Sequence, residues 1–260
     1  MTPSSNTPLH GQNPLGRFSD RAQDYARYRP TYPAAAIDLI LQGLPDPTQL
    51  QVADIGAGTG ISARLLADRG ASVWAIEPNA AMREAATPHP GVTFQEGTAE
   101  QTGLPDASVD LVLCAQSFHW FDQSVALTEF HRILKPQGRV ALMWNDRNLE
   151  DEFTQAYSEI VGRAADRQIF DREDRKSGAA LQGSPLFMNF QAPIVFHQYS
   201  LDQTSLLGLV LSASYVPKSG AAYEQLITDL HSLYQRWVDR TPGDCVNLSY
   251  RVNLYLADRA

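Results

Sequence analysis

A glycine-rich segment, Val52-Ala-Asp-Ile-Gly-Ala-Gly-Thr-Gly60, limits most strongly how this chain can fold. Gln51–Ile55 predicts a short strand, and Ile61–Arg69 predicts a helix that Gly70 ends. Glycines between a strand and a helix let a ligand approach the backbone amides closely. The next predicted strand, Ser72–Ile76, ends at Glu77, an acid placed to accept hydrogen bonds from ribose hydroxyls. The sequence therefore predicts a nucleoside-binding turn in an α/β sheet.

Strand-like and helix-like stretches alternate along the chain as far as Trp144. Val109–Ala115 is a nearly continuous apolar run, as expected for a parallel strand covered on both faces. In Val246–Leu256 every second residue is apolar, which predicts a long antiparallel C-terminal strand at the edge of the sheet. These patterns predict an α/β fold with a doubly wound, seven-stranded, mostly parallel, Rossmann-like sheet. The other expected strands are Gly91–Gln95, Gly138–Trp144 and Phe187–Tyr199, and the other expected helices are Ala34–Gln42, Ala80–Ala86 behind Asn79, Ser124–Leu134, Leu149–Ala165, Arg172–Leu181, Thr204–Leu211 and Ala221–Val238.

The composition argues against several classes of protein. Cys114 and Cys245 stand far apart without metal-ligand spacing, so we expect buried thiols, a reducing compartment and no metal site. No apolar run approaches the ~18 residues of a membrane span, and the first residues carry no secretory signal, so we expect a cytoplasmic protein with no membrane partner. The formal charge of −8, from 29 acidic and 21 basic residues, argues against a nucleic-acid partner.

The glycine spacing separates two kinds of nucleotide site. A dinucleotide fingerprint, G-x-G-x-x-G, needs a glycine where this chain has Ile61. Asp54 also precedes the first glycine by two residues, and both features favour a nucleoside that carries an amino-acid tail. Here the chain resembles the class I S-adenosylmethionine-dependent methyltransferases, in particular small-molecule enzymes with a type 11 domain. The resemblance covers residues 17–147 and rests on five motifs in family order: Asp54-Ile-Gly-Ala-Gly-Thr-Gly60, Glu77-Pro-Asn-Ala-Ala-Met-Arg83, Gly97-Thr-Ala-Glu100, Val109-Asp-Leu-Val112 and Arg132-Ile-Leu-Lys-Pro-Gln-Gly138.

This resemblance implies S-adenosyl-L-methionine as the cofactor. It implies that Glu77 binds the ribose, that the glycine loop cradles the amino-acid tail, and that Ala99 with Glu100 lies near the adenine. Two positions depart from the family pattern, because Thr98 stands where many relatives carry an acid and Gln137 replaces a glycine. The expected cofactor-binding residues are Tyr25, Arg29, Asp54, Gly56, Ala57, Gly58, Gly60, Glu77, Pro78, Met82, Thr98, Ala99, Glu100 and Gln116.

Three further segments resemble one subgroup of small-molecule methyltransferases: Phe18-x6-Tyr25-x3-Arg29-Pro-x-Tyr-Pro33, Gln116-Ser-Phe-His-Trp-Phe-Asp122 and Trp144-Asn-Asp-Arg147. The first implies a lid over the cofactor, and a plain Arg-Pro turn whose tyrosine packs on the sheet is the alternative. The other two follow predicted strands and should face the methyl group. His119 is the candidate catalytic base, with packing beside Trp120 as the alternative. The expected acceptor-site residues are Phe18, His119, Trp120, Trp144 and Tyr215.

The sequence thus predicts a division of the chain and a reaction. We expect residues 1–16 to be a disordered tail and 17–260 to be one domain, with a cofactor-binding core (17–147), a substrate-cap insertion (148–215) and a closing helix and strand (216–260). The expected reaction is methyl transfer to a small-molecule acceptor by in-line displacement, in a monomer or homodimer. The alternatives are a nicotinamide-dependent oxidoreductase and a non-catalytic module that binds the cofactor.

Overall fold

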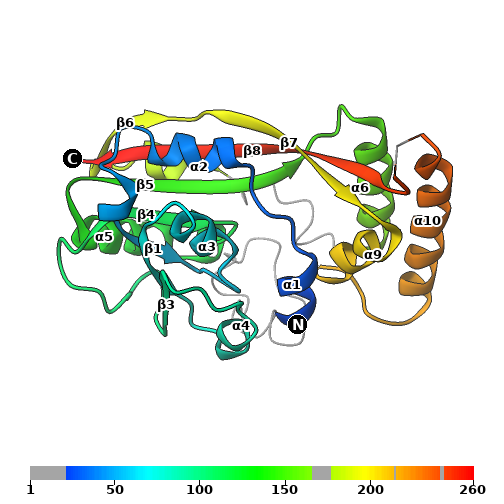
Figure 1. Cartoon of the computed structure of the whole chain (residues 1–260), viewed down its shortest axis with the longest axis horizontal. Coiled ribbons are helices and arrows are strands. Elements are labelled where there is room, and N and C mark those ends of the chain that lie inside the picture. Colours follow the sequence, from blue (N-terminus) through cyan, green and yellow to red (C-terminus); the bar gives the residue numbers. More distant parts are fainter. Residues whose placement is uncertain (1–21, 166–176, 214, 241–242) are drawn as a thin grey trace, which may run out of the picture.

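The computed structural model describes residues 22–165, 177–213, 215–240 and 243–260, and its centre is one mixed β-sheet (Figure 1). The strand order is β3-β2-β1-β4-β5-β8-β6, and β7 also pairs with β8. The first five strands in this order are parallel, whereas β8 is antiparallel to β5. The strands are β1 Gln51–Ile55, β2 Ser72–Ile76, β3 Val92–Gln95, β4 Val109–Ala115, β5 Leu134–Arg147, β6 Phe187–Gln191, β7 Ile194–Leu201 and β8 Val246–Arg259. The predicted doubly wound α/β fold is confirmed.

The last position of the sheet is divided between two strands. The single predicted strand 187–199 is interrupted after Gln191, and β6 and β7 pair with successive parts of β8. Pro193 lies at the break, and a proline has no N–H to donate to a strand ladder. Its carbonyl oxygen accepts a hydrogen bond from the backbone N–H of Leu254 at 3.0 Å. Eight strands therefore fill seven positions, where the sequence predicts seven strands.

The C-terminal strand β8 is antiparallel as predicted, but its predicted place at the edge of the sheet is wrong. It pairs with β5 on one side and with β6 and β7 on the other. Alternation of apolar residues shows which face of a strand is buried and does not show whether both of its hydrogen-bonding edges are paired. A second difference concerns β5, which begins at Leu134, before the predicted Gly138. Gln137 lies in this added part with a φ of 67°, a left-handed conformation that glycine adopts without strain.

The helices follow the predicted ranges closely, except that residues 22–28, for which the sequence predicts no helix, are helical. Asparagine and aspartate side chains cap four of them, because Asn79, Asp122, Asp151 and Asp202 each accept hydrogen bonds from first-turn amides. The helices are α1 Ala22–Tyr28, α2 Ala34–Leu41, α3 Ile61–Ala67, α4 Ala80–Glu84, α5 Gln123–Ile133, α6 Glu152–Ala164, α8 Ala179–Gln182, α9 Gln203–Leu211 and α10 Ala221–Val238, with 3-10 turns η2 Pro47–Gln49 and η3 Phe118–Trp120. Most of the predicted helix 172–181, the predicted tail 1–16 and Phe18 lie outside the described residues.

Two apolar clusters cover the two faces of the sheet. One joins α2 and α3 to strand residues such as Val52 and Leu111. The other joins α5 and α8 to the opposite side chains, among them Val112, Leu142 and Trp144. Neighbouring residues of β4 therefore point into different clusters, as they should in a strand buried on both faces. Cys114 is buried in the second cluster, and Cys245 is half-buried, both as free thiols.

A third apolar cluster forms the cap. It combines α6, α9 and α10 with the first residues of β8, and Figure 1 shows these helices together at one end of the long strands. Helix α1 contacts both α9 and α4, so it joins the cap to the core. The predicted boundary at residue 215 falls between α9 and α10, which contact each other in this cluster. The cap packing thus involves residues on both sides of that boundary.

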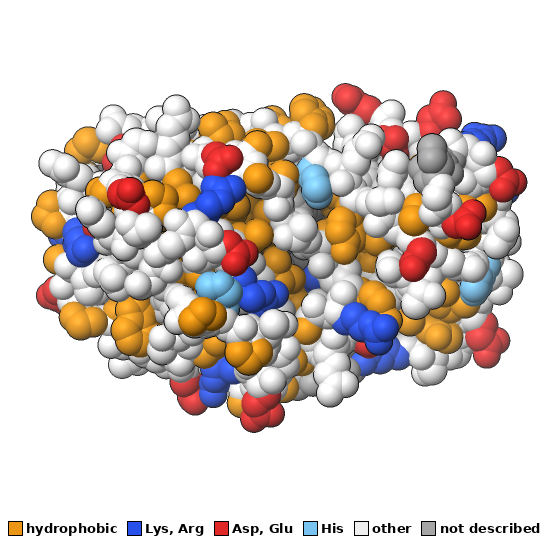
Figure 2. All heavy atoms as spheres, in the orientation of Figure 1, with side chains coloured by type: hydrophobic (Ala, Val, Ile, Leu, Met, Phe, Trp, Pro, Cys, Tyr) orange, Lys and Arg blue, Asp and Glu red, His pale blue; other side chains and the backbone are white. Residues whose placement is uncertain are grey.

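The surface is mixed in charge. On the face seen in Figure 2, basic side chains lie interspersed with acidic ones and with apolar side chains. Within the described residues, no helix is long and apolar enough to cross a membrane. The same residues contain no group of three or more His, Cys, Asp or Glu side chains that could hold a metal ion.

Candidate functional site

The glycine loop after β1 is held against the end of β2. The backbone N–H groups of Gly56 and Ala57 both donate to the carbonyl oxygen of Ile76, at 2.8 and 3.2 Å. Gly56, Gly58 and Gly60 have φ values of 66°, 59° and 75°, which lie in the left-handed region. A side chain at these positions would strain the backbone, so the loop can turn this tightly only with glycine.

Glu77 ties the same loop to the start of the next helix. Its Oε2 accepts the N–H of Gly58 and its Oε1 accepts the N–H of Asn79, both at 2.9 Å. The guanidinium of Arg83 donates to the Glu77 carbonyl oxygen at 2.7 Å. The side chain is only 8% exposed, and burial raises the pKa of Glu77, although these hydrogen bonds and Arg83 oppose the rise. Each carboxylate oxygen keeps a lone pair with which it can accept a hydrogen bond from a hydroxyl group.

Asp54 is a second buried acid beside the loop. Its Oδ2 accepts a hydrogen bond from Ser62 Oγ at 2.7 Å, while its Oδ1 has no hydrogen-bond partner among the described residues. Burial raises the pKa of Asp54 to about 7, and the charge of Glu77 adds to the rise. A cationic group brought next to this loop would be stabilised by Asp54 and would favour its ionised form.

The space in front of Gly58 is bounded by two side chains. A Cβ built on Gly58 would lie 3.2 Å from Met82 Cε and 3.9 Å from the Tyr25 ring. Met82 is buried on α4, and Pro78 is half-buried just before that helix. The glycine therefore leaves a cradle between the loop, α4 and α1 that any other residue would fill.

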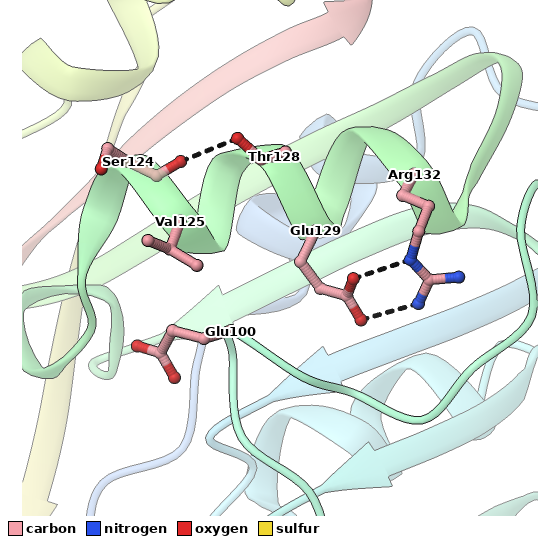
Figure 3. Close-up of a pocket in the computed structure, with 6 residues that line it drawn as sticks. All are labelled: Glu100, Ser124, Val125, Thr128, Glu129 and Arg132. Carbon is pink, nitrogen blue, oxygen red and sulfur yellow. Dashed lines mark hydrogen bonds and ion pairs between the residues drawn. The ribbon is translucent and has the colours of Figure 1, made fainter.

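The three residues predicted to lie near the adenine are in the turn after β3, and they differ in how far they are buried. Ala99 is buried, Thr98 is exposed, and Glu100 is half-buried and accepts the backbone N–H of Asp122 at 2.9 Å. A hollow lies between Glu100 and α5. In Figure 3, Glu100 lies beside the first turn of α5, and Glu129 pairs with Arg132 farther along the same helix. The residues lining this hollow are Glu100, Ser124, Val125, Thr128, Glu129 and Arg132, none of which belongs to the glycine loop.

The end of β4 is bonded to its neighbours on both sides. Gln116 has a φ of 59°, and its backbone N–H donates to Met143 O at 2.8 Å. Ser117 Oγ donates to Ile55 O at 2.7 Å, which links the end of β4 to the end of β1. A Cβ on Gly56 would lie 2.7 Å from the Ser117 Cβ, so these two strand ends pack closely. The predicted strand ends do meet at one edge of the sheet.

His119 lies in an aromatic setting, 7% exposed. Its Nδ1 accepts a hydrogen bond from the indole N–H of Trp144 at 3.3 Å, and its ring lies 5.0 Å from that of Trp120. An indole only donates, so a neutral His119 in this arrangement carries its proton on Nε2. To accept a further proton on Nδ1, the ring would have to break its hydrogen bond with Trp144. This contact matches the packing alternative more closely than a role as base.

The segment after α1 brings a cation to the site. The guanidinium carbon of Arg29 lies 4.8 Å from the centroid of the Tyr25 ring, and its Nη2 donates to Ser212 O at 3.3 Å. Its Nε is buried without a hydrogen-bond partner, and among the described residues no carboxylate forms an ion pair with it. Burial raises the pKa of Tyr32 well above its ordinary value, with Tyr25 and the charge of Asp54 adding to the rise.

A second arginine, Arg147, lies between the core and the cap. It is not among the site residues predicted from the sequence. The Arg147 guanidinium sits 4.8 Å from the centroid of the Tyr157 ring, and its Nη2 donates to the Tyr215 hydroxyl at 3.0 Å. Burial raises the pKa of Tyr250 to about 12, although Arg147 and Arg29 oppose the rise. Arg147 belongs to a motif that the sequence singles out, but nothing in the sequence pairs it with Tyr157.

Comparisons of the sequence with known proteins point to methyltransferases. A family described as "Methyltransferase domain" matches residues 53–142. An uncharacterized methyltransferase of Mycobacterium tuberculosis is 40% identical over 152 residues, which are 57% of this chain and 60% of that protein. A Dictyostelium discoideum protein named "Putative methyltransferase" is 25% identical over 268 residues, 98% of each chain. The match therefore spans about 60% of the length of the mycobacterial relative.

Solved structures show the same fold. A "Putative Type II Methyltransferase" from Anaeromyxobacter dehalogenans has a TM-score of 0.67 and 23% identity, covering 89% of this chain and 98% of that chain. An N-methyltransferase from Haemonchus contortus, solved in complex with S-adenosylhomocysteine, has a TM-score of 0.53 and 17% identity, covering 93% and 57%. At these identities the likeness is one of fold.

Proposed function

We propose, from the premise that this chain is a class I S-adenosylmethionine-dependent methyltransferase, that it transfers the cofactor's methyl group to a small-molecule acceptor. The hydrogen bond from Gly58 to the buried Glu77 is the observation that carries the proposal. It joins the loop that would hold the amino-acid tail to the acid that would hold the ribose. A fold neighbour that binds S-adenosylhomocysteine supports the same choice of cofactor.

The described residues fit such a ligand. The cradle in front of Gly58 gives the tail room, and the buried acid Asp54 beside the loop favours a cationic group there. Arg29, with no ion pair among the described residues, would bind the carboxylate of the tail. Ala99 would lie against the adenine, where the proposed contact is apolar.

S-adenosylmethionine, when bound, supplies a methyl group on a sulfonium, which is an excellent leaving group. The protein then has to align donor and acceptor and keep water out. The Ser117 bond to Ile55 and the Trp144 bond to His119 fix the ends of β1, β4 and β5 relative to one another. We propose that Trp120 makes the wall of this site apolar, and that the buried Trp144 holds His119 in place through their hydrogen bond.

Isothermal titration with S-adenosylhomocysteine tests the cofactor assignment. We expect binding by the folded protein at ~100 μM or below, and no binding would refute it. Release of S-adenosylhomocysteine from S-adenosylmethionine in the presence of a metabolite panel then separates an enzyme from a non-catalytic module. A titration with NADH tests the oxidoreductase alternative, which Ile61 disfavours because it opens α3 where a dinucleotide site needs its third glycine.

A further inference from the structure

The outer edge of β7 lacks the usual protection of a strand edge. β7 pairs with β8 on one side, and among the described residues no strand pairs with its other side. Figure 1 shows β6 and β7 following one another along this border of the sheet. Soluble proteins usually protect such edges with charged residues or proline, but none of these occurs from Ile194 to Leu201.

The free edge carries a regular row of backbone donors and acceptors. The carbonyl oxygen of Pro193 accepts the N–H of Leu254 on β8 at 3.0 Å, so these two residues form a hydrogen-bonded pair. Hydrogen-bonded and non-hydrogen-bonded pairs alternate along an antiparallel ladder. Four residues of β7 therefore direct their N–H and C=O groups away from β8: Ile194, Phe196, Gln198 and Ser200. Within the described part of the chain, none of these backbone groups has a hydrogen-bond partner.

The same border is also apolar. Among the described residues five large hydrophobic side chains are exposed, and three of them belong to β6 and β7. Met188 is 49% exposed, Ile194 50% and Phe196 63%. Ile194 and Phe196 are two residues apart and so lie on one face of the sheet. Covering this edge would therefore bury apolar side chains as well as pair backbone groups.

The charges near this edge favour a second copy of the chain as its partner. The chain has a formal charge of −8, but β7 has no charged residue, and the part of β8 beside it has only Arg251, the register partner of Phe196. If two β7 strands pair, the two Arg251 residues are three strand spacings or ~14 Å apart, beyond the Debye length of ~8 Å at physiological salt. Burial lowers the pKa of His197, so this side chain is neutral at pH 7. A second copy therefore meets no like charge along β7, and β7 offers no charge that would select a partner of opposite sign.

We propose that β7 pairs with β7 of a second copy of this chain, antiparallel and about a two-fold axis, so that the two sheets become one. Hydrogen-bonded pairs must join residues that both direct their backbone groups outward. The longest such register has His197 on the axis, Ile194 opposite Ser200 and Phe196 opposite Gln198. It also makes the two Phe196 rings diagonal neighbours on one face, within reach of each other. The same surface is used by both copies, so the assembly closes as a dimer.

Sedimentation velocity of the full chain from about 1 to 100 μM tests the dimer. We expect a dimer that Phe196→Lys weakens at least tenfold, because the lysine replaces the apolar pair with two like charges. Gln198→Pro should also weaken it at least tenfold, because it removes an outward N–H that makes no bond to β8. The control is Leu149→Lys, since Leu149 is 56% exposed and lies after β5, outside β6 and β7. Thermal unfolding shows whether each variant is folded.

Disulfide crosslinking tests the register. Residues on the axis form a non-hydrogen-bonded pair with Cα atoms about 4.5 Å apart, which is within the range of a disulfide. We therefore expect His197→Cys to crosslink under mild oxidation. Ser200→Cys is the control, because the two copies of residue 200 lie about 20 Å apart in this register. Both variants are made with Cys245→Ser, since Cys245 is half-buried whereas Cys114 is buried.

Salt dependence separates this pairing from association through opposite charges. Raising the salt from about 50 to 500 mM should strengthen the dimer, because it screens the repulsion between two chains of charge −8.

Four results would overturn the proposal: a wild-type monomer at ~100 μM, a dimer that Phe196→Lys and Gln198→Pro leave unchanged, weakening by salt, or species that keep growing with concentration. Crosslinking of Ser200→Cys in place of His197→Cys would refute the register. None of these measurements requires the cofactor, so their outcome is independent of the proposed function.

Discussion

Replacing Asp54 with asparagine should stabilise the protein at neutral pH. The carboxyl is fully buried, its Oδ1 has no hydrogen-bond partner among the described residues, and burial raises its pKa from 3.8 to about 7. The unfolded chain loses this proton near pH 4, whereas the folded protein keeps it to about pH 7. Between these values the folded state binds more protons, so the free energy of unfolding falls as pH rises. An asparagine keeps the acceptor for Ser62 and removes the charge.

The size of the effect follows from the shift. Roughly three pKa units at about 1.4 kcal/mol each give an upper limit of about 4 kcal/mol in favour of Asp54→Asn above pH 7. The advantage should shrink as pH falls and vanish near pH 4, where both states are protonated. We expect weaker binding of S-adenosylhomocysteine as the accompanying loss, because the asparagine carries no charge for a cationic group.

Urea unfolding followed by circular dichroism at pH 5, 6.5 and 8 measures this profile. The control is Asp46→Asn, since hydrogen bonds from Thr48 lower the pKa of that exposed aspartate. An aspartate whose pKa is lowered by folding stabilises the folded state at pH values above its pKa in the unfolded chain. Asp46→Asn should therefore be slightly less stable than the wild type at pH 8, whereas Asp54→Asn should be more stable. If Asp54→Asn is no more stable at pH 8, or its gain does not depend on pH, the account of a carboxylate destabilised by burial is refuted.

Three further substitutions test the site and the packing of α1. Glu77→Ala should weaken S-adenosylhomocysteine binding by about 1.5–3 kcal/mol, as expected for lost charge-assisted hydrogen bonds; unchanged affinity in calorimetry would exclude the ribose role. Gly58→Ala should cost about 1–2 kcal/mol of stability because the φ of Gly58 is 59°. It should also weaken S-adenosylhomocysteine binding, because the new methyl group would lie 3.2 Å from Met82 and fill the cradle. Wild-type affinity would show that the ligand does not use this cradle. Gly208→Ala would place a Cβ 2.4 Å from the Tyr28 ring and should displace α1, so limited proteolysis should cut α1 faster while the far-UV spectrum stays nearly constant; equal cleavage would show that α1 does not depend on this contact.

The local pattern of the sequence predicts the core well. The glycine loop, the acid after β2 and the Asn79 cap each depend on residues close together in the chain, so periodicity and turn chemistry are enough to place them. The break between β6 and β7 also has a local signal in Pro193. A proline inside a predicted strand indicates an interruption, and giving it more weight would have divided the strand.

Contacts between distant segments could not be predicted in this way. Tyr250 falls on the buried side of an alternating strand, but the pattern does not identify Arg147 as its neighbour across the ladder. The contact of Tyr157 with Arg147 depends on how α6 is placed over the end of β5, which is decided by tertiary packing. Similarly, His119 and Trp144 are both recognisable by sequence, yet their hydrogen bond is visible only in the fold.

The interior position of β8 has a consequence for how the chain folds during synthesis. The hydrogen-bonding edge of β5 that β8 covers stays unpaired until about a hundred further residues have been made. An exposed strand edge is a template for pairing with other chains, so the nascent core is prone to aggregate in this interval. Since β8 also supplies Tyr250 to the cap, the cap and the sheet can be completed only when this strand arrives. We therefore expect refolding to be limited by docking of β8, a long-range step of high contact order.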